Sequence, residues 1–314
     1  MEKTRFSSSS NNTKYDHTPR VTLDFHHDDS IAILTLSNPR RRNALTYSMM
    51  EQLDDHVTTL ETWSKVGTAL STCNGVGSRE VLNGSRAIIL TGSHDHFCSG
   101  LDLYDHAQTN HLLQPGPQMN LHMTQVTNRL YSLSVPSIAA VDGNAIGGGA
   151  ELTTCTDFVV LAYNARVQFV HAKRGASPGW GGGRRLVNKV GRRMALQMLL
   201  LDKYIRGSEE AKSLCYADGV GNEEESALDA SMRLIVKPIL ELPCPKAIRA
   251  IKSVVCAADG DRDVIDVEKK TLLYDSNKAL VAEREAFVSV WGGDSNLKQI
   301  KEAKDKLREK KIES

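Results

Sequence analysis

The stretch PSIAAVDGNAIGGGAELTTCTD, from Pro136 to Asp157, decides the fold of this chain. It opens with an apolar run, Ser137 to Val141, turns through several glycines and continues into a helical pattern around Glu151. We therefore predict a buried strand, a glycine loop and a helix in succession. The first N–H groups of a helix have no partner within it, so such a loop can hold a negative oxygen.

A second loop of the same kind, FCSGLD, runs from Phe97 to Asp102 and follows the apolar run Ala87 to Leu90. If the two loops converge on one point, their N–H groups form an oxyanion hole. Such a hole suits a reaction in which a thioester carbonyl becomes an enolate. The alternative for each loop is a tight turn that needs glycine for its backbone angles and carries no chemistry.

The composition excludes several other classes of protein. A net charge of +1 over 314 residues gives no broad basic surface for nucleic acid, and the apolar runs are too short to cross a bilayer. The six cysteines show no CxxC pair, so we expect reduced, buried thiols. His94, His96, Asp102 and Asp105 share one stretch, but their placement is loose and we expect no metal site.

The first 20 residues are expected to be a disordered tail. They contain a serine run, Ser7 to Ser10, and no apolar segment, which argues against a secretory signal. Glu2 and Asp16 argue against a mitochondrial transit peptide. The expected location is therefore cytoplasmic, with a mitochondrial one less favoured.

Residues 21–220 are expected to form the core of an α/β fold, because strand patterns alternate with helical ones. The core opens with a hairpin, Val21 to Phe25 and Ile31 to Leu36, followed by a helix with Thr46 as its N-cap. The stretch from Ser64 to Gly84 has little periodicity and predicts an irregular surface insertion.

Two further segments are expected, a polar loop and a C-terminal helical region. Residues His106 to Pro117 are expected to form a polar loop. Residues 221–314 are expected to form a helical region. The helices predicted there are Ala227 to Leu240, Pro245 to Ala257, Val264 to Trp291 and Asn296 to Lys310.

The order of the motifs resembles the crotonase family, also called the enoyl-CoA hydratase/isomerase family. The matching segments are NPRRRNALT (Asn38 to Thr46), FCSGLDL, PSIAAVDGNAIGGGAELTTCTD, PGWGGGRRL (Pro178 to Leu186) and GSEEAKSLCYADGV (Gly207 to Val220). The resemblance implies a spiral of ββα units with a C-terminal helical region. It also implies a CoA-thioester substrate with no separate cofactor, and assembly as a homotrimer or homohexamer.

Other segments resemble one branch of this family, the ethylmalonyl-CoA decarboxylases. They are GGGAELTT, QFVHAKRG (Gln168 to Gly175), the tryptophan of PGWGG, and VWGGDSNL (Val290 to Leu297). This resemblance implies decarboxylation of a branched malonyl-CoA, either ethylmalonyl-CoA or methylmalonyl-CoA. It also implies a metabolite-repair role that removes a side product of fatty acid synthesis.

The resemblance assigns three catalytic positions. The oxyanion donors are the backbone N–H groups of Leu101 and Gly148, and Glu151 matches one catalytic glutamate of the hydratases. Hydratases use a second glutamate to deliver water, but no carboxylate occurs from Phe169 to Pro178. The loss of one of two acid–base groups disfavours hydration.

Decarboxylation needs fewer groups, since no proton has to be removed. We hypothesise that Glu151 is protonated, with a raised pKa, and delivers a proton to the enolate carbon. His171 is a second candidate for contacting the carboxylate or donating the proton, and its alternative is a structural role. Trp180 is a candidate apolar wall or an ordinary core residue. Lys173 and Arg174 are expected to be solvated.

The CoA moiety needs cationic partners, and Arg40, Arg41 and Arg42 precede the segment with which family members cradle CoA. The alternative is a solvated charge run. The residues expected to bind substrate or CoA are Arg42, Asn43, Ala44, Ser99, Gly100, Asp102, Leu103, Gly147, His171, Pro178 and Trp180.

Two other functions stay open. One is an enoyl-CoA hydratase or isomerase acting on fatty acyl-CoA. The other is a non-catalytic RNA-binding protein, because one family relative binds AU-rich RNA. An aromatic content of only 5% and the balanced charge disfavour RNA binding, so we expect no nucleic-acid or membrane partner.

Overall fold

The computed structural model describes most of the chain between residues 17 and 306. The described residues are 17–66, 84–108, 115–201, 203–242, 245–258, 265–266, 271–272, 284, 287–288, 291–292, 297–298 and 300–306. The expected disordered tail lies outside the described residues up to residue 16. Arg20, the last residue of that expected tail, already belongs to the first strand.

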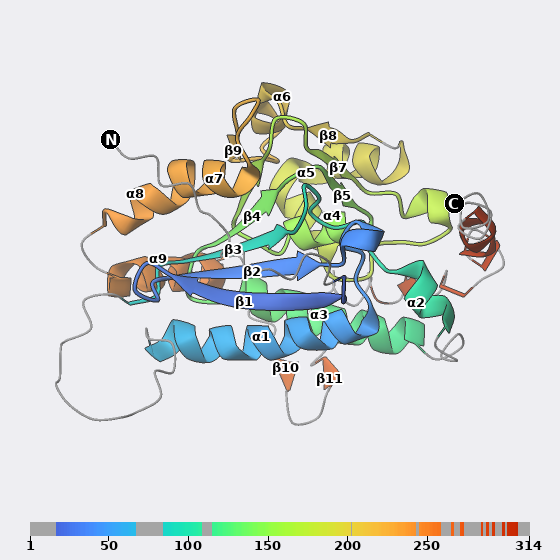
Figure 1. The fold of residues 1–314 in the computed structure, drawn as a ribbon, viewed down its shortest axis with the longest axis horizontal. Coiled ribbons are helices and arrows are strands. Elements are labelled where there is room, and N and C mark those ends of the chain that lie inside the picture. The colour runs from blue at the N-terminus through green and yellow to red at the C-terminus, as the bar shows by residue number, and fades with distance from the viewer. Residues whose placement is uncertain are drawn as a thin grey trace.

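A six-stranded sheet forms the centre of the fold (Figure 1). Its strands, in spatial order, are β1 (Arg20–His26), β2 (Ile31–Ser37), β3 (Ala87–Gly92), β4 (Ser137–Val141), β6 (Phe158–Leu161) and β9 (Gly219–Val220). The β1–β2 hairpin is antiparallel and every other pair is parallel. The residues of β4 are all buried, as expected for a parallel strand covered on both faces.

A smaller sheet, in the order β5 (Asn144–Ile146), β7 (Arg166–Gln168) and β8 (Ile205–Arg206), lies beside it. Strands β5 and β7 are parallel, with Ile146 opposite Gln168. The residues that follow these two strands therefore emerge next to each other.

Helices cover the sheet. Helix α1 (Tyr47–Val66) packs on β1, β2 and α3 (Pro115–Tyr131), and α7 (Ala227–Ser231) packs on β4, β6 and β9 (Figure 1). The other α-helices are α2 (Leu103–Gln108), α4 (Gly148–Thr153), α5 (Gly182–Leu200), α6 (Glu209–Ser213), α8 (Lys237–Leu240) and α9 (Pro245–Ala258). Short 3-10 helices occupy Pro39–Arg41 and Ala172–Arg174, and a π-helix occupies Met232–Val236.

Local signals in the sequence placed several elements correctly. The predicted N-cap is confirmed, since the Thr46 hydroxyl accepts a hydrogen bond from the backbone N–H of Met49 at 3.2 Å. The predicted hairpin and the alternating α/β order are also confirmed. The helical stretch predicted from Ala227 to Leu240 is continuous through α7, the π-helix and α8.

Three expectations fail. Helix α1 continues to Val66, so the irregular insertion does not begin at Ser64; residues 67–83 lie outside the described residues. The polar loop from His106 to Pro117 is wrong at both ends, because α2 runs to Gln108 and α3 begins at Pro115, a favoured residue for a helix start.

The third failure concerns the C-terminal region. Ile265–Asp266 pairs with Thr271–Leu272 as a small antiparallel hairpin, where a helix from Val264 to Trp291 is expected. β-branched residues such as Ile265 and Thr271 favour this extended backbone. Helical backbone is present at residues 297–298 and 300–306, in agreement with the last predicted helix.

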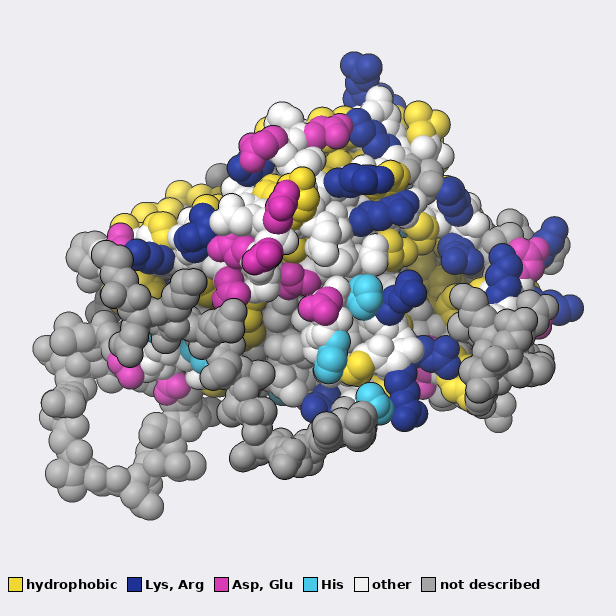
Figure 2. Space-filling model, turned by 45° about the horizontal axis from the view of Figure 1, so that its top comes forward, with side chains coloured by type: hydrophobic (Ala, Val, Ile, Leu, Met, Phe, Trp, Pro, Cys, Tyr) yellow, Lys and Arg dark blue, Asp and Glu magenta, His cyan; other side chains and the backbone are white. Residues whose placement is uncertain are grey.

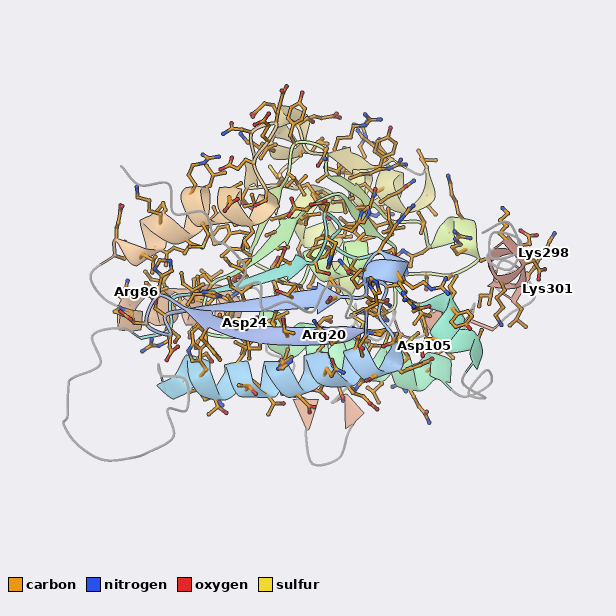
Figure 3. The ribbon with its side chains drawn as sticks, viewed as in Figure 1. Arg20, Asp24, Arg86, Asp105, Lys298 and Lys301 are labelled. Atoms are coloured by element: carbon orange, nitrogen blue, oxygen red, sulfur yellow. The ribbon has the colours of Figure 1, made fainter. Side chains whose placement is uncertain are left out.

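Arg86, the residue directly before β3, connects the C-terminal region to the central sheet (Figure 3). Its guanidinium donates to the carbonyl oxygens of Ile239 in α8 (3.2 Å) and of Leu242, just beyond the end of α8 (2.7 Å). A cation at a helix C-terminus stabilises the unpaired carbonyl groups there. Within the described residues, no helix is long and apolar enough to span a membrane.

Candidate active site

The first glycine loop is held by the buried side chain of Asn43. Its Nδ2 donates to the carbonyl oxygens of Ser93 and His96, both at 2.7 Å, and its Oδ1 accepts from the N–H of Asn38 at 2.9 Å. Every polar atom of this amide group is therefore used inside the protein. Asn43 fixes the loop that follows β3 and is fully buried.

The two glycine loops lie directly against each other. The N–H of Cys98 donates to the carbonyl of Asn144 at 3.1 Å, and the N–H of Ile146 donates to the carbonyl of Cys98 at 2.9 Å. Gly100 has a φ of +92°, and a Cβ atom there would lie 2.8 Å from the Ile146 carbonyl and 3.2 Å from the Gly148 nitrogen. Only glycine permits this approach.

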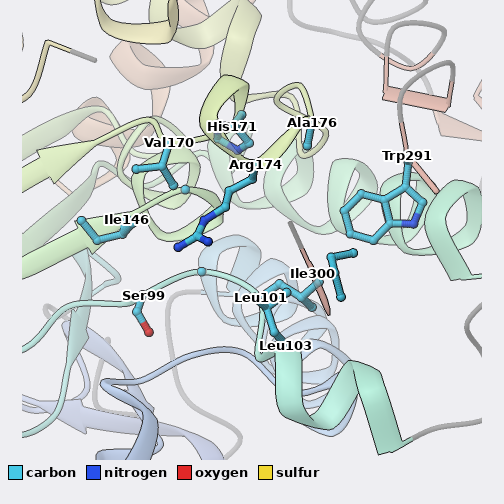
Figure 4. A pocket seen from close by; sticks show the side chains of 13 residues that line it. Ser99, Leu101, Leu103, Ile146, Val170, His171, Arg174, Ala176, Trp291 and Ile300 are labelled. Carbon is cyan, nitrogen blue, oxygen red and sulfur yellow. The ribbon is translucent and has the colours of Figure 1, made fainter. Parts of the chain in front are cut away.

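Both predicted oxyanion donors line one cavity of about 170 Å³ (Figure 4). Gly148 is the first residue of α4, and among the described residues no hydrogen-bond acceptor is present for its N–H or for that of Leu101. The cavity is lined by Ser99, Gly100, Leu101, Leu103, Ile146, Gly147, Gly148, Val170, His171, Arg174, Ala176, Trp291 and Ile300.

Trp180 packs against the backbone of this site without lining the cavity. Its side chain is buried, and a Cβ atom added at Gly148 would lie 2.3 Å from its ring. Trp180 is not a lining residue of the cavity. The indole therefore packs behind the Gly148 backbone and fixes the position of that N–H group.

Glu151 is a buried carboxylate surrounded by donors. Its oxygens accept hydrogen bonds from the backbone N–H groups of Trp180 (2.8 Å), Gly182 (3.1 Å) and Gly179 (3.2 Å). The Nε2 atom of His171 lies 2.9 Å from Oε1. Glu151 is only 2% exposed and does not line the cavity.

The expectation of a raised pKa at Glu151 is wrong. Burial acts to raise its pKa, but the hydrogen bond and the charge of His171 and the donors of Trp180 and Gly179 outweigh burial, so the pKa lies below its ordinary value. Glu151 is therefore ionised and cannot give a proton to an enolate.

The loop from Gly179 to Gly182 is anchored on its carbonyl side as well. The Trp180 carbonyl accepts from the Thr127 hydroxyl (2.7 Å) and from Nη2 of the buried Arg185 (2.5 Å). Side chains of α3 hold the Gly179 carbonyl in the same way. They are Asn120 and Thr124.

His171 opens a tight turn. Its carbonyl accepts from the N–H groups of Arg174 (2.8 Å) and Ala176 (3.0 Å), and Gly175 closes the turn with a φ of 62°. The turn follows β7, and Val170, the residue before His171, lies beside Gly147, where an added Cβ atom would be 3.5 Å from the Val170 side chain. The second ring nitrogen of His171, Nδ1, is buried and has no hydrogen-bond partner among the described residues.

Arg174 is exposed, as expected, and it also lines the cavity. Its guanidinium extends along the cavity on the side of His171, toward Ser99 and Ile146 (Figure 4). The site therefore contains a cation beside the two amide donors.

The sequence predicted about half of the lining correctly. The predicted residues that line the cavity are Ser99, Gly100, Leu101, Leu103, Gly147, Gly148 and His171. The predicted residues outside the lining are Arg42, Asn43, Ala44, Asp102, Glu151, Pro178 and Trp180. The lining residues that were not predicted are Ile146, Val170, Arg174, Ala176, Trp291 and Ile300.

Asp102 has a structural position. It is buried, and its Oδ1 accepts from the N–H groups of Tyr104 (2.9 Å) and Asp105 (3.2 Å), which caps the start of α2. Its Oδ2 accepts from Nδ2 of Asn38 at 3.2 Å. Asp102 orients Leu103, the next residue, which does line the cavity.

The arginine segment borders the cavity through Ser99. The Ser99 N–H donates to the carbonyl of Arg42 (3.0 Å), and its hydroxyl donates to the carbonyl of Arg41 (2.8 Å). The Arg41 guanidinium stacks over the Tyr104 ring at 4.7 Å. Arg41 and Arg42 therefore lie at one edge of the site. The pKa of the nearby His96 is lowered, first by burial and then by the charge of Arg42.

The fold and the paired glycine loops define an acyl-CoA enzyme, and the chain belongs to the enoyl-CoA hydratase/isomerase family, or crotonase family. The family's sequence model, described as "Enoyl-CoA hydratase/isomerase", matches residues 80–276. The family resemblance and the fold class inferred from the sequence are thus confirmed.

Similar proteins within the family are ethylmalonyl-CoA decarboxylases. The protein of that name from Danio rerio is 35% identical over 286 residues, which cover 89% of this chain and 82% of the relative. The Homo sapiens protein is 30% identical over 298 residues, which cover 90% of this chain and 81% of the relative.

Solved structures agree on the fold. An enoyl-CoA hydratase/isomerase from Mycobacterium paratuberculosis superposes with a TM-score of 0.68 at 19% identity, covering 92% of this chain and 100% of the other. An enoyl-CoA hydratase from Bacillus halodurans superposes with a TM-score of 0.66 at 19% identity, covering 90% and 98%.

Proposed function

We propose that the protein decarboxylates a branched malonyl-CoA thioester, such as ethylmalonyl-CoA or methylmalonyl-CoA, in this cavity. One observation carries the proposal. The cavity combines the N–H groups of Leu101 and Gly148 with the cation of Arg174 and the imidazole of His171, while none of its described lining residues carries a carboxylate. This set suits an anionic substrate whose carbonyl oxygen gains negative charge.

The reaction begins when the thioester oxygen accepts hydrogen bonds from Leu101 and Gly148. The guanidinium of Arg174 binds the α-carboxylate and turns its C–C bond perpendicular to the carbonyl plane. That bond breaks, CO2 leaves, and the electron pair enters the carbonyl to form an enolate. The two amides stabilise the enolate oxygen, and one such donor contributes about 2.7–4 kcal/mol in other enzymes.

The relatives support the same activity. Ethylmalonyl-CoA decarboxylases of several vertebrates are 30–35% identical to this chain over most of its length. A metabolite-repair role, in which a malonyl-type side product of fatty acid synthesis is removed, follows from the proposed substrate.

Hydration of an enoyl-CoA is the alternative within the family. It requires a second acid–base group to position and activate water. Glu151 is ionised and already accepts several hydrogen bonds, and no described lining residue supplies another carboxylate. We therefore expect hydration of crotonyl-CoA to be slow or absent.

RNA binding is the alternative outside enzymology. On the face shown in Figure 2, Lys and Arg side chains gather toward one side and Asp and Glu side chains toward the other. The Tyr204 ring is already stacked by two arginines, Arg166 at 3.9 Å and Arg206 at 5.1 Å. We assign the basic side to CoA phosphates, and salt-dependent binding of single-stranded RNA would contradict this assignment.

Assembly as a homotrimer or homohexamer and a cytoplasmic location stay predictions. Leu196, Leu200 and Leu201, at the end of α5, expose apolar side chains that an interface between copies would bury. Sedimentation of the purified protein tests this, and a monomer at micromolar concentration would contradict it.

The activity is tested with a panel of CoA thioesters. CO2 release is measured from malonyl-CoA, methylmalonyl-CoA and ethylmalonyl-CoA, beside hydration of crotonyl-CoA. We expect CO2 release from the branched thioesters to exceed any hydration. Hydration without CO2 release would overturn the proposal.

A further inference from the structure

We propose that His171 is the acid that protonates the enolate carbon, and that the buried carboxylate of Glu151 is the positioning group that orients its ring. This inference rests on the proposed decarboxylation and names the catalytic group that completes it. It corrects the expectation that Glu151 itself supplies the proton.

The contacts of Glu151 determine which ring nitrogen carries a hydrogen. An ionised carboxylate has only acceptor sites, so Nε2 of His171, at 2.9 Å from Oε1, must donate to it. The N–H groups of Gly179, Trp180 and Gly182 hold the carboxylate in place. Rotation of the imidazole is therefore restricted by a fixed anion.

The other ring nitrogen is the one that we assign to the reaction. Within the part of the chain that the structure describes, Nδ1 is buried and has no hydrogen-bond partner, and His171 lines the same cavity as Gly148. A buried polar atom without a partner is uncommon and calls for an explanation. The partner that we assign to Nδ1–H is the reacting carbon of a substrate bound in the cavity.

The other groups at this place cannot act as the acid. Glu151 is ionised and lies outside the lining, and a guanidinium such as that of Arg174 does not lose its proton in proteins. Glu151 and Arg174 are the charged groups that face His171 from α4 and from its own turn.

Protonation of the enolate by His171 conserves atoms and electrons. Loss of CO2 leaves an enolate; its α-carbon forms a bond to the proton of Nδ1 as the N–H bond breaks, and the oxygen electrons reform the carbonyl. The products are the saturated acyl-CoA and a neutral imidazole, which takes one proton from solvent. Because the acid is fixed on one side of the cavity, the proton reaches one face of the enolate.

The experiment measures the facial selectivity of protonation with ethylmalonyl-CoA in D2O. We expect the wild-type butyryl-CoA to carry deuterium at C2 in one configuration. In His171→Asn, CO2 release should fall by about 100-fold, and the deuterium should be distributed over both configurations. The matched control is His122→Asn on α3, outside the cavity, which should retain the wild-type rate and selectivity.

Selectivity and CO2 release that are both unchanged in His171→Asn would overturn the assignment. A wild-type enzyme that releases no CO2 from any malonyl thioester would instead overturn the proposed function.

Discussion

The indole of Trp180 lies against the backbone of Gly148, so that a Cβ atom at Gly148 would approach the ring to 2.3 Å. This contact links the third glycine-rich segment to the proposed oxyanion hole. Glu151 and Arg185 hydrogen-bond to the N–H and the carbonyl of Trp180, and the ring in turn packs against the backbone of Gly148. The position of one proposed oxyanion donor therefore depends on a buried polar network.

Substitution of Gly148 tests this contact. In Gly148→Ala the new methyl group overlaps the indole, which should cost about 1–3 kcal/mol of unfolding free energy. Displacement of the amide should also lower kcat by about 100- to 1,000-fold. Urea unfolding and CO2 release measure the two effects.

A second substitution tests whether overlap between the new methyl group and the Trp180 indole causes the loss of stability in Gly148→Ala. In the double variant Gly148→Ala, Trp180→Leu, the smaller side chain makes room for the methyl group. We expect the double variant to be more stable than the sum of the two single changes predicts. Strict additivity would show that the two residues do not interact.

Glu151 should be important for stability. In Glu151→Gln, an amide NH2 group replaces an acceptor and faces backbone N–H donors that are already buried, which should cost about 3–5 kcal/mol. Urea unfolding measures the loss. Glu51→Gln, on the exposed face of α1, is the control and should change stability by less than about 0.5 kcal/mol.

The lowered pKa of Glu151 also predicts an acid sensitivity. A carboxyl group with a folded-state pKa below its unfolded value of 4.5 adds stability that is fully present above that value. The contribution is lost as pH falls through the folded-state pKa. Unfolding free energy should thus decline more steeply below pH 4.5 in the wild type than in Glu151→Gln. Parallel curves would contradict an ionised Glu151.

Arg174 should select substrates that carry a carboxylate. In Arg174→Gln, KM for ethylmalonyl-CoA should rise by about 10- to 100-fold, since a charge-assisted hydrogen bond is lost. Inhibition by butyryl-CoA, which has no such group, should be unchanged. Lys173→Gln, at an exposed position outside the cavity, should leave both constants unaltered.

The sequence predicts the parts of the site that depend on local backbone. Leu101 and Gly148 line one cavity, as expected, because a strand, a glycine turn and a helix start already determine the course of the backbone at both positions. The charge state of Glu151 was not predictable, since the donors that ionise it come from a distant loop around Trp180. Trp291 enters the cavity from the C-terminal region, and no local pattern reports such a long-range contact.

The same reasoning explains why two residues expected to bind substrate or CoA do not line the cavity. Asn43 and Asp102 lie in segments that the family resemblance assigns to binding. Both side chains hydrogen-bond to backbone groups instead, and only the folded structure shows which partners an amide or a carboxylate has. Arg174 was not among the residues expected at the site; it lines the cavity although its side chain is exposed.

The proposed decarboxylation depends on polarisation of the acyl carbonyl by the N–H groups of Leu101 and Gly148. Isotope-edited infrared spectroscopy of butyryl-CoA labelled with 13C at the thioester carbonyl measures this polarisation directly. Bound to the wild-type protein, the carbonyl stretch should shift to lower frequency than in water, and the shift should diminish in Gly148→Ala. A carbonyl frequency on the protein equal to that in water would contradict polarisation by these two amides.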